Sequence, residues 1–175
     1  AAMPVFAAEI TSAAKQAHVT DFTTGKVLFS KDADAPMKPA SMAKIMTIFV
    51  AFQRIADGQL GMDDTFTISE KARNKGGSRT FLEVGSTVSV RELLYGIIVQ
   101  SGNDAAIALA EGVSGTENAF VQEMNFWAKK IGMKNTNFQN STGWPDPDLT
   151  TTAVDLNIMT TELIRRFPAD KYPDL

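Results

Sequence analysis

A serine and a lysine three residues apart stand in the stretch from Lys38 to Phe52, which reads K-P-A-S-M-A-K-I-M-T-I-F-V-A-F. If this stretch is helical, Ser41 and Lys44 lie on one face, because residues three apart on an α-helix are neighbours. A lysine that is neutral near pH 7 can take the proton of a serine hydroxyl, and burial among apolar side chains lowers the pKa of a lysine. The pattern therefore indicates a serine nucleophile with a lysine base. The alternative for Lys44 is an ammonium that reaches the surface along the helix.

The Ser-x-x-Lys spacing is a weak signal when it stands alone, and the chain contains it twice. The second copy, Ser12 and Lys15, lies near the N-terminus and has no apolar run around its lysine, so we interpret it as a chance match. Ser41 differs because it is expected in the first turn of a buried helix, where free backbone N–H groups can stabilise an oxyanion. The apolar surroundings of Lys44 carry the prediction more than the spacing does.

Composition limits the other chemistries. The 175 residues include one histidine, His18, and no cysteine, so thiolate nucleophiles, thiolate metal sites and disulfides are excluded, and a Ser-His-Asp triad would have to use His18. We interpret His18 as a strand residue on a surface face, because the residues from Gln16 to Phe22 alternate in polarity. The net charge is −3 and no cluster of Lys and Arg is present, so no nucleic-acid partner is predicted.

Ser101-Gly102-Asn103 is a second group that could do chemistry. It is the only Ser-x-Asn in the chain and falls where a predicted helix breaks, so its side chains are expected to point into a cleft. A hydroxyl there can relay a proton, and an amide can hold a carbonyl of a substrate. The alternative is a turn that only caps two helices.

The rest of the sequence predicts a short N-terminal hairpin followed by a mainly helical bundle. The helix that carries Lys44 is apolar almost all round, which is typical of a central, buried helix. Residues 59–88 are interpreted as loop-rich. The predicted strands cover residues 16–22, 26–30 and 65–68, with a turn at Gly25. The predicted helices cover residues 40–57, 90–100, 105–111, 117–131 and a last one that begins after Thr152 and stops before Pro168.

Four blocks of the sequence resemble one family. Ser-x-x-Lys together with Ser-x-Asn is shared by the penicillin-binding proteins and the serine β-lactamases. From about residue 16 to its end, the chain is similar to the low-molecular-mass penicillin-binding proteins, the serine-type D-alanyl-D-alanine carboxypeptidases of bacteria. The blocks are P-A-S-M-A-K, G-G-S-R-T-F-L-E-V-G, I-V-Q-S-G-N-D-A-A and N-T-N-F-Q-N-S-T-G-W-P-D-P. The resemblance implies an α+β fold of the serine β-lactamase/DD-peptidase type, with a helical subdomain, part of an antiparallel sheet and a cleft between them.

The resemblance also implies a role for each candidate residue. Ser41 would be the acylated nucleophile and Lys44 the base that activates it. Ser101 would pass a proton to the leaving D-alanine nitrogen, and Asn103 would bind the substrate's amide. The backbone N–H of Ser41 would supply half of the oxyanion hole, and residues 76–81 would border the cleft. The substrate would be a peptidoglycan stem peptide, β-lactams would be covalent inhibitors, and no metal or organic cofactor is implied.

One element of the family pattern is missing from the sequence. No lysine is followed by Ser or Thr and then Gly, whereas the family carries a K-T-G element on a sheet strand. There it binds the substrate carboxylate and supplies the other oxyanion donor. We therefore expect residues 1–15 to be an N-terminal segment, left from an export signal or from cloning, and residues 16–175 to be the N-terminal part of a catalytic domain that further chain or a second polypeptide completes. Alone, this part is expected to be inactive.

Three alternatives stay open on the sequence. A class A β-lactamase would need a glutamate four residues before the Asn of a Leu-Asn pair, but Ala153 stands four residues before Asn157. A muropeptide endopeptidase or a serine esterase would use the same nucleophile on another acyl group. A non-catalytic wall-binding module would explain the missing K-T-G. Because the family acts on the cell wall, the expected location is the periplasm or the outer face of the cytoplasmic membrane.

Overall fold

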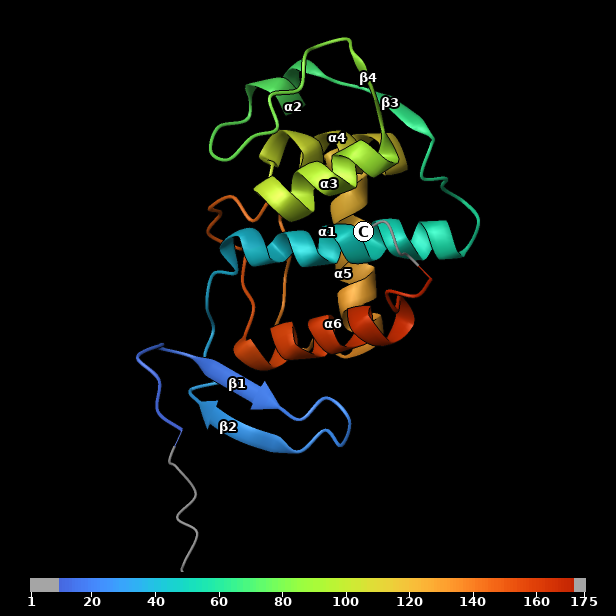
Figure 1. The fold of residues 1–175 in the computed structure, drawn as a ribbon. Helices are drawn as coiled ribbons and strands as arrows, with labels where there is room; N and C mark the ends of the chain where they lie inside the picture. The colour runs from blue at the N-terminus through green and yellow to red at the C-terminus, as the bar shows by residue number, and fades with distance from the viewer. Residues whose placement is uncertain (1–9, 172–175) are drawn as a thin grey trace, which may run out of the picture.

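A computed structural model describes residues 10–171 of the 175-residue chain. The described part is an α+β structure, in which helices surround one central helix and two small antiparallel sheets lie at opposite ends (Figure 1). This confirms the fold class that the sequence predicts. The expected N-terminal segment 1–15 lies partly outside the described residues.

The central helix is α1 (Ala43–Ala56), and a short 3-10 turn, η1 (Ala40–Met42), precedes it. Most side chains of α1 are buried, as the apolar run predicts. The structure places Ser41 in the 3-10 turn rather than in the first turn of the α-helix, because the Met42 N–H bonds to the Pro39 carbonyl three residues back, at 3.1 Å. Lys44 is the second residue of α1.

Four further helices pack against α1 and close the core around it. The starts of the first and the last of them carry the predicted caps, in which Ser89 and Thr152 accept hydrogen bonds from backbone N–H groups three residues on. These helices are α3 (Val90–Gln100), α4 (Asn103–Ser114), α5 (Glu117–Ile131) and α6 (Ala153–Arg166).

The boundaries of α3, α5 and α6 agree with the prediction, and that of α4 does not. This helix begins two residues earlier than predicted, at Asn103. The reason is that Gly102 is the N-cap of α4 and has an extended backbone (φ −61°, ψ 120°). A single residue, Gly102, therefore separates the C-cap of α3, Ser101, from the first residue of α4. As a result, the Asn103 and Asp104 side chains project from the first turn of a helix.

Each of the two sheets is a pair of antiparallel strands. Strands β1 (Ala17–Thr20) and β2 (Val27–Lys31) form the predicted N-terminal hairpin, and Gly25 in its turn has a φ of 73°, which a residue without a Cβ adopts easily. Strands β3 (Thr65–Thr67) and β4 (Thr87–Ser89) form the second pair, with helix α2 (Glu70–Asn74) between them. The prediction of loop in residues 59–88 therefore missed α2 and β4, which are too short to show a periodic pattern.

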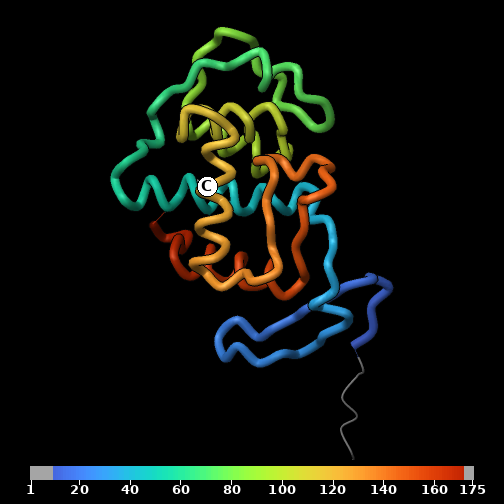
Figure 2. The backbone as a smooth tube through the Cα atoms, turned by 180° about the vertical axis from the view of Figure 1, so that it is seen from behind, coloured from blue at the N-terminus to red at the C-terminus, as the bar shows by residue number. Residues whose placement is uncertain are grey.

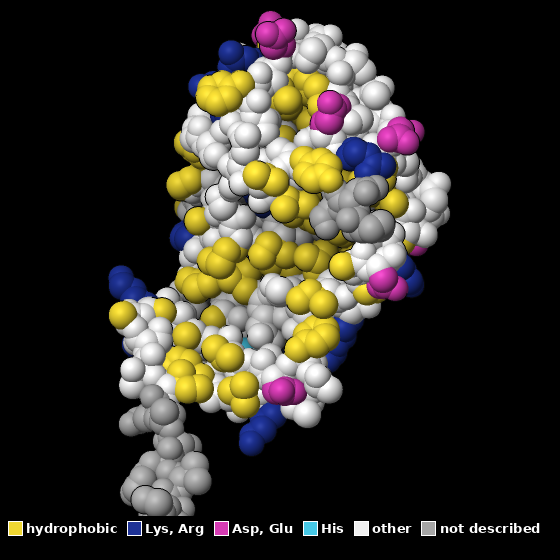
Figure 3. All heavy atoms as spheres, viewed as in Figure 1, with side chains coloured by type: hydrophobic (Ala, Val, Ile, Leu, Met, Phe, Trp, Pro, Cys, Tyr) yellow, Lys and Arg dark blue, Asp and Glu magenta, His cyan; other side chains and the backbone are white. Residues whose placement is uncertain are grey.

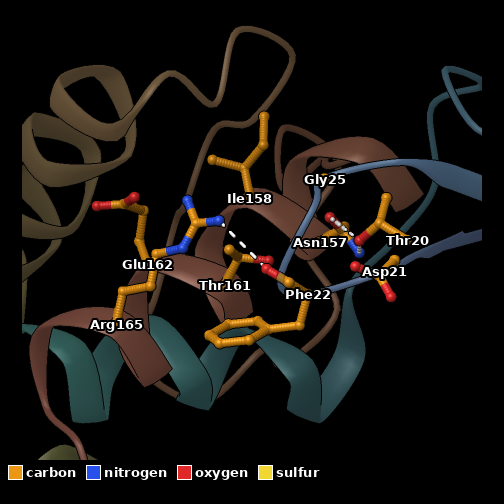
Figure 4. A pocket seen from close by; sticks show the side chains of 9 residues that line it. All are labelled: Thr20, Asp21, Phe22, Gly25, Asn157, Ile158, Thr161, Glu162 and Arg165. Carbon is orange, nitrogen blue, oxygen red and sulfur yellow. Dashed lines mark hydrogen bonds between the residues drawn. The ribbon is translucent and has the colours of Figure 1, made fainter.

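The β1–β2 hairpin packs against α6, and a pocket opens between them (Figure 4). The Asn157 side-chain amide donates to the Thr20 hydroxyl at 3.1 Å, and Arg165 donates to the Phe22 carbonyl at 3.4 Å. His18 lies in β1 as predicted, but it is half-buried rather than on a surface face, and it lines a second pocket that the hairpin shares with α6. Its Nδ1 atom is buried and has no hydrogen-bond partner within residues 10–171.

Candidate active site

Ser41 and Lys44 meet at the start of the central helix. Ser41 is exposed, whereas only 3% of Lys44 is accessible to solvent. The Lys44 Nζ atom lies 3.3 Å from Ser41 Oγ, so the Ser-x-x-Lys spacing brings a hydroxyl and an amine into contact as predicted. The alternative of an ammonium that reaches the surface is wrong.

The surroundings of Lys44 favour the neutral amine. Its two hydrogen-bond partners are neutral oxygens, the Ser41 hydroxyl and, at 2.8 Å, the backbone carbonyl of Thr142. Burial therefore lowers the pKa of Lys44 from 10.5 to about 8. At that pKa, about one tenth of the lysine is neutral at pH 7, against about one molecule in 3,000 for an unperturbed side chain. Such an amine can accept the proton of Ser41 at neutral pH.

The carbonyl that contacts Lys44 belongs to a tight turn, residues 140–144. The Asn140 carboxamide oxygen accepts three hydrogen bonds within this turn, from the Thr142 N–H (3.2 Å), the Thr142 hydroxyl (3.0 Å) and the Trp144 N–H (2.9 Å). These bonds fix the direction in which the Thr142 carbonyl points. We call these residues the 140–144 turn.

The 140–144 turn also lies directly against η1. Gly143 has a φ of 77°, and a Cβ atom added there would lie 1.7 Å from the Ala40 carbonyl oxygen. No side chain fits in that space, so the sequence needs glycine for two reasons, the positive φ and the close approach. This contact sets the backbone of η1, and with it Ser41, against the turn that holds Lys44.

Ser101 and Asn103 lie at the junction between α3 and α4. Ser101 ends α3 with a left-handed backbone (φ 54°) and is half-buried. Asn103 is buried, and its side-chain Nδ2 donates to the Gly76 carbonyl at 2.8 Å while its backbone N–H donates to the Ser78 carbonyl at 2.8 Å. The group is therefore both a helix junction and an anchor for the segment around Gly76.

Asp104 completes this anchor. Its buried carboxylate accepts hydrogen bonds from the Thr80 N–H (2.9 and 3.0 Å to the two oxygens), from the Thr80 hydroxyl (3.0 Å) and from the Leu82 N–H (3.3 Å). The first turn of α4 thus holds residues 76–82 through side-chain and backbone groups. This segment includes residues 76–81, which the family resemblance predicts to border the cleft.

Trp144 connects the two halves of the site. A Cβ atom added at Gly77 would lie 3.0 Å from Trp144 Cζ3 and 2.7 Å from Asn103 Nδ2, so the indole and the amide are neighbours across this glycine. The Lys75 ammonium lies 4.4 Å from the centre of the Trp144 ring. Figure 2 shows the segment after α5 returning alongside that helix toward the start of α1. The 140–144 turn therefore contacts the Ser41–Lys44 pair on one side and the Asn103 anchor on the other.

The D-alanyl-D-alanine carboxypeptidase family model matches residues 3–173, nearly the whole chain. The chain belongs to this family. It is 42% identical to the D-alanyl-D-alanine carboxypeptidase DacF of Bacillus subtilis over 164 residues, which are 94% of this chain and 42% of that protein.

Solved structures agree with this family assignment. The crystal structure of the D-alanyl-D-alanine carboxypeptidase DacD from Francisella tularensis superposes with a TM-score of 0.91 at 40% identity, covering 96% of this chain and 41% of that one. Penicillin-binding protein 5 from Haemophilus influenzae gives a TM-score of 0.91 at 36% identity, with 96% and 49% covered. The chain thus spans less than half of the length of these relatives.

The second Ser-x-x-Lys pair of the chain, Ser12 and Lys15, lies in surroundings unlike those of Ser41 and Lys44. Ser12 and Lys15 are both exposed, and the Ser12 hydroxyl accepts from the Ala14 N–H at 3.1 Å. This agrees with the interpretation of Ser12 and Lys15 as a chance match.

The predicted site residues did not include three residues that contact the candidate site, namely Asp104, Thr142 and Trp144. Thr142 acts through a backbone carbonyl, which has no sequence signature. Asp104 could have been found, because an acidic residue directly after Ser101-Gly102-Asn103 opens an otherwise Ala-rich helix. Trp144 stands in one of the quoted family blocks but has no charge or nucleophile to mark it.

Within residues 10–171, no group of three or more His, Cys, Asp or Glu side chains is placed to hold a metal ion. The helices of the same residues are too short or too polar to span a membrane.

Proposed function

We propose that this protein is a serine-type D-Ala-D-Ala carboxypeptidase, which removes the terminal D-alanine of peptidoglycan pentapeptides through an acyl-enzyme on Ser41. The observation that supports this most directly is the contact between Lys44 Nζ and Ser41 Oγ at 3.3 Å, with the lysine buried and its pKa lowered to about 8. β-Lactams would acylate the same serine. Residues 16–175 would form the N-terminal part of the catalytic domain, which would act outside the cytoplasmic membrane.

In the acylation step, neutral Lys44 takes the proton of Ser41 as the hydroxyl oxygen attacks the carbonyl carbon of the scissile peptide bond. The new C–O bond places negative charge on the carbonyl oxygen. The backbone N–H of Ser41 is one donor for that oxyanion. Since the 140–144 turn fixes both η1 and the Lys44 amine, the base and the nucleophile stay in register during the attack.

The second half of acylation needs a proton on the leaving group. We assign to Ser101 the relay of the proton that Lys44 took from Ser41: the Ser101 hydroxyl donates its proton to the nitrogen of the departing D-alanine and regains one from the Lys44 ammonium, because a hydroxyl both donates and accepts. Asn103 would bind the substrate's amide, and its hydrogen bond to the Gly76 carbonyl fixes the plane of the carboxamide for that contact. Water then hydrolyses the ester to Ser41 and returns the free enzyme.

A β-lactamase function has less support. The place of the class A glutamate is taken by Ala153 at the start of α6, and Asn157 is engaged with Thr20 of the hairpin. A carboxylate that could activate the deacylating water is therefore absent from this place in the described chain. A penicillin adduct on Ser41 should be long-lived.

The experiment is done on the full-length protein with a fluorescent penicillin and, separately, with a pentapeptide that ends in D-Ala-D-Ala. We expect covalent labelling of Ser41 and release of free D-alanine, both abolished by Ser41→Ala and both unaffected by Ser12→Ala. Rapid turnover of nitrocefin would instead support a β-lactamase. Cleavage of cross-linked muropeptides without D-alanine release would support an endopeptidase.

A further inference from the structure

Glu117 is a buried carboxylate beside the 140–144 turn. It is the first residue of α5 and only 7% exposed. Its Oε1 atom accepts two hydrogen bonds from Ser141, from the backbone N–H at 3.0 Å and from the hydroxyl at 2.8 Å. Its other oxygen, Oε2, lies 2.7 Å from the ammonium of Lys71 on α2. All three partners are donors, so the ionised carboxylate suits this place.

The charge on Glu117 strengthens its hold on Ser141. Burial acts to raise the pKa of Glu117, but the hydrogen bonds and the charge supplied by Lys71 and Ser141 outweigh it and bring the pKa below its ordinary value. Glu117 is therefore ionised at neutral pH. Hydrogen bonds to an ionised acceptor are about twice as strong as those between neutral groups.

Ser141 and Thr142 face Glu117 on one side and α1 on the other. The Ser141 carbonyl accepts from the Thr47 hydroxyl at 2.7 Å, and the next carbonyl, that of Thr142, accepts from Lys44 Nζ at 2.8 Å. Thr47 and Lys44 are three residues apart and lie on one face of α1. The carbonyls of Ser141 and Thr142 thus both contact that face of α1. The carboxylate of Glu117 binds the backbone N–H of Ser141, which belongs to the peptide unit just before these two carbonyls.

We propose that Glu117 is a positioning residue for acylation: by holding Ser141, it keeps the Thr142 carbonyl where it directs the Lys44 amine at Ser41. The proposal rests on the proposed function of Ser41 and Lys44. Glu117 itself does not touch the substrate. Its effect reaches the base through one peptide unit.

A second buried carboxylate, which contacts the same segment between α5 and α6, provides a matched control. Asp155 on α6 is 2% exposed, and its Oδ2 accepts from the Asn135 N–H at 2.8 Å and from the Thr136 hydroxyl at 2.7 Å. It thus makes the same kind of contact as Glu117, a backbone N–H and a hydroxyl on one carboxylate oxygen, but at the start of the segment, away from Lys44. Loss of either carboxylate should destabilise the fold, and only loss of Glu117 should disturb the base.

The test compares Glu117→Ala, Glu117→Gln and Asp155→Ala in the full-length protein. The first readout is the rate constant of acylation by a fluorescent penicillin, measured apart from the noncovalent binding constant. The second is hydrogen exchange of the Ser141, Thr142 and Gly143 amides. We expect Glu117→Ala to slow acylation by about 10- to 100-fold, the effect of a displacement on the order of 1 Å in a catalytic group, and to speed exchange at these three amides.

Glu117→Gln separates positioning from the ion pair with Lys71. Its carboxamide oxygen can still accept from Ser141, so acylation should recover to within about fivefold of wild type, the effect of one weakened hydrogen bond. Asp155→Ala should lower the melting temperature but leave acylation within about twofold. If Glu117→Ala does not fold, Ser141→Ala takes its place, with an expected loss of about fivefold from the missing hydroxyl contact.

The proposal is overturned if Glu117→Ala acylates at the wild-type rate, if its exchange at residues 141–143 is unchanged, or if Asp155→Ala slows acylation as much. A wild-type protein that reacts with no penicillin and releases no D-alanine contradicts the proposed function instead. In that case the exchange data still decide whether Glu117 holds the turn.

Discussion

Lys44 occupies a place that is unfavourable for a charged amine. It is almost fully buried, its partners are the neutral oxygens of Ser41 and Thr142, and burial shifts its pKa to about 8. A protein that needed only a filled core would be more stable with an apolar side chain here. The proposed role of Lys44 as the base for Ser41 would account for a lysine at this position, because that role uses the neutral amine.

Replacement of this lysine should separate stability from activity. Lys44→Met keeps an unbranched apolar side chain as far as Cε and removes the amine, so we expect an increase of about 0.5–2 kcal/mol in the free energy of unfolding at pH 7 together with loss of acylation. Because the folded pKa is depressed, the destabilising effect of Lys44 is complete below pH 8 and fades as the pH rises toward 10.5. Urea unfolding at pH 7 and at pH 10 measures this. A Met variant less stable than wild type at pH 7 would contradict it.

The pH dependence of acylation follows from the same pKa. Only the neutral amine accepts a proton, and its fraction falls about tenfold for each pH unit below 8. The second-order rate constant for reaction with a fluorescent penicillin should therefore rise between pH 6 and 8 and level off above it. A rate that keeps rising through pH 10 would indicate an unperturbed lysine, and a rate that is flat from pH 6 to 9 would remove Lys44 as the base.

At the scale of elements, the site depends on how closely the 140–144 turn approaches η1. A Cβ at Gly143 would lie 1.7 Å from the Ala40 carbonyl oxygen, a distance that forces one of the two segments to move. Either movement changes the relation between Ser41 on η1 and the Thr142 carbonyl on the turn. The Ser41–Lys44 pair is thus held by backbone packing between η1 and the 140–144 turn as much as by helix α1, which carries Lys44.

Gly143→Ala should therefore lower the acylation rate, an effect that the strain of an alanine at positive φ would not produce by itself. A matched control is Gly115→Ala, because Gly115 has nearly the same φ, 78° against 77°, and no atom within 4 Å of an added Cβ. We expect the control to lose about 1 kcal/mol of stability and to keep its acylation rate. Gly143→Ala should lose more stability and at least about tenfold in rate. Thermal unfolding and penicillin labelling of both variants give the answer, and equal rates in the two would contradict the argument.

The elements that the sequence predicts well are those with a periodic pattern and a clear end. The boundaries of α5 follow from an apolar repeat closed by Gly132, and the start of α3 follows from the capping box at Ser89. Short elements such as α2 (Glu70–Asn74) are missed because five residues show no period. Each of these outcomes depends on information that lies within one segment of the chain.

The candidate site was predicted only where side chains carry the chemistry. Ser41 and Lys44 are visible as residue types at a known spacing, and the structure brings them together. The Thr142 carbonyl and the close approach at Gly143 are backbone features that arise when residues about 100 positions apart in the chain meet. Glu117 is a charged residue at the start of a helix, which is common, and only its partners in the fold distinguish it.

On the scale of the whole molecule, the described residues show apolar side chains on their surface. They gather between α1 and α6 and on the β1–β2 hairpin (Figure 3), where Val19, Val27 and Leu28 are exposed. Within residues 10–171 the sheet that holds β1 and β2 has only these two strands, so each has an unpaired edge. Apolar patches and open edges of this kind tend to be covered by further structure.

The last prediction concerns residues 1–175 as an isolated polypeptide. They contain no lysine followed by Ser or Thr and then Gly. The K-T-G element, to which the family resemblance assigns carboxylate binding and the second oxyanion donor, therefore has no counterpart in them. Loss of one oxyanion donor costs about 100- to 1,000-fold in rate. We expect the isolated polypeptide to bind a hydrophobic dye and to label with fluorescent penicillin at least about 100-fold more slowly than the full-length protein, with Ser41→Ala as the blank. Efficient labelling of Ser41 in the isolated polypeptide would contradict this expectation and show that residues 1–175 are sufficient for acylation without a K-T-G element.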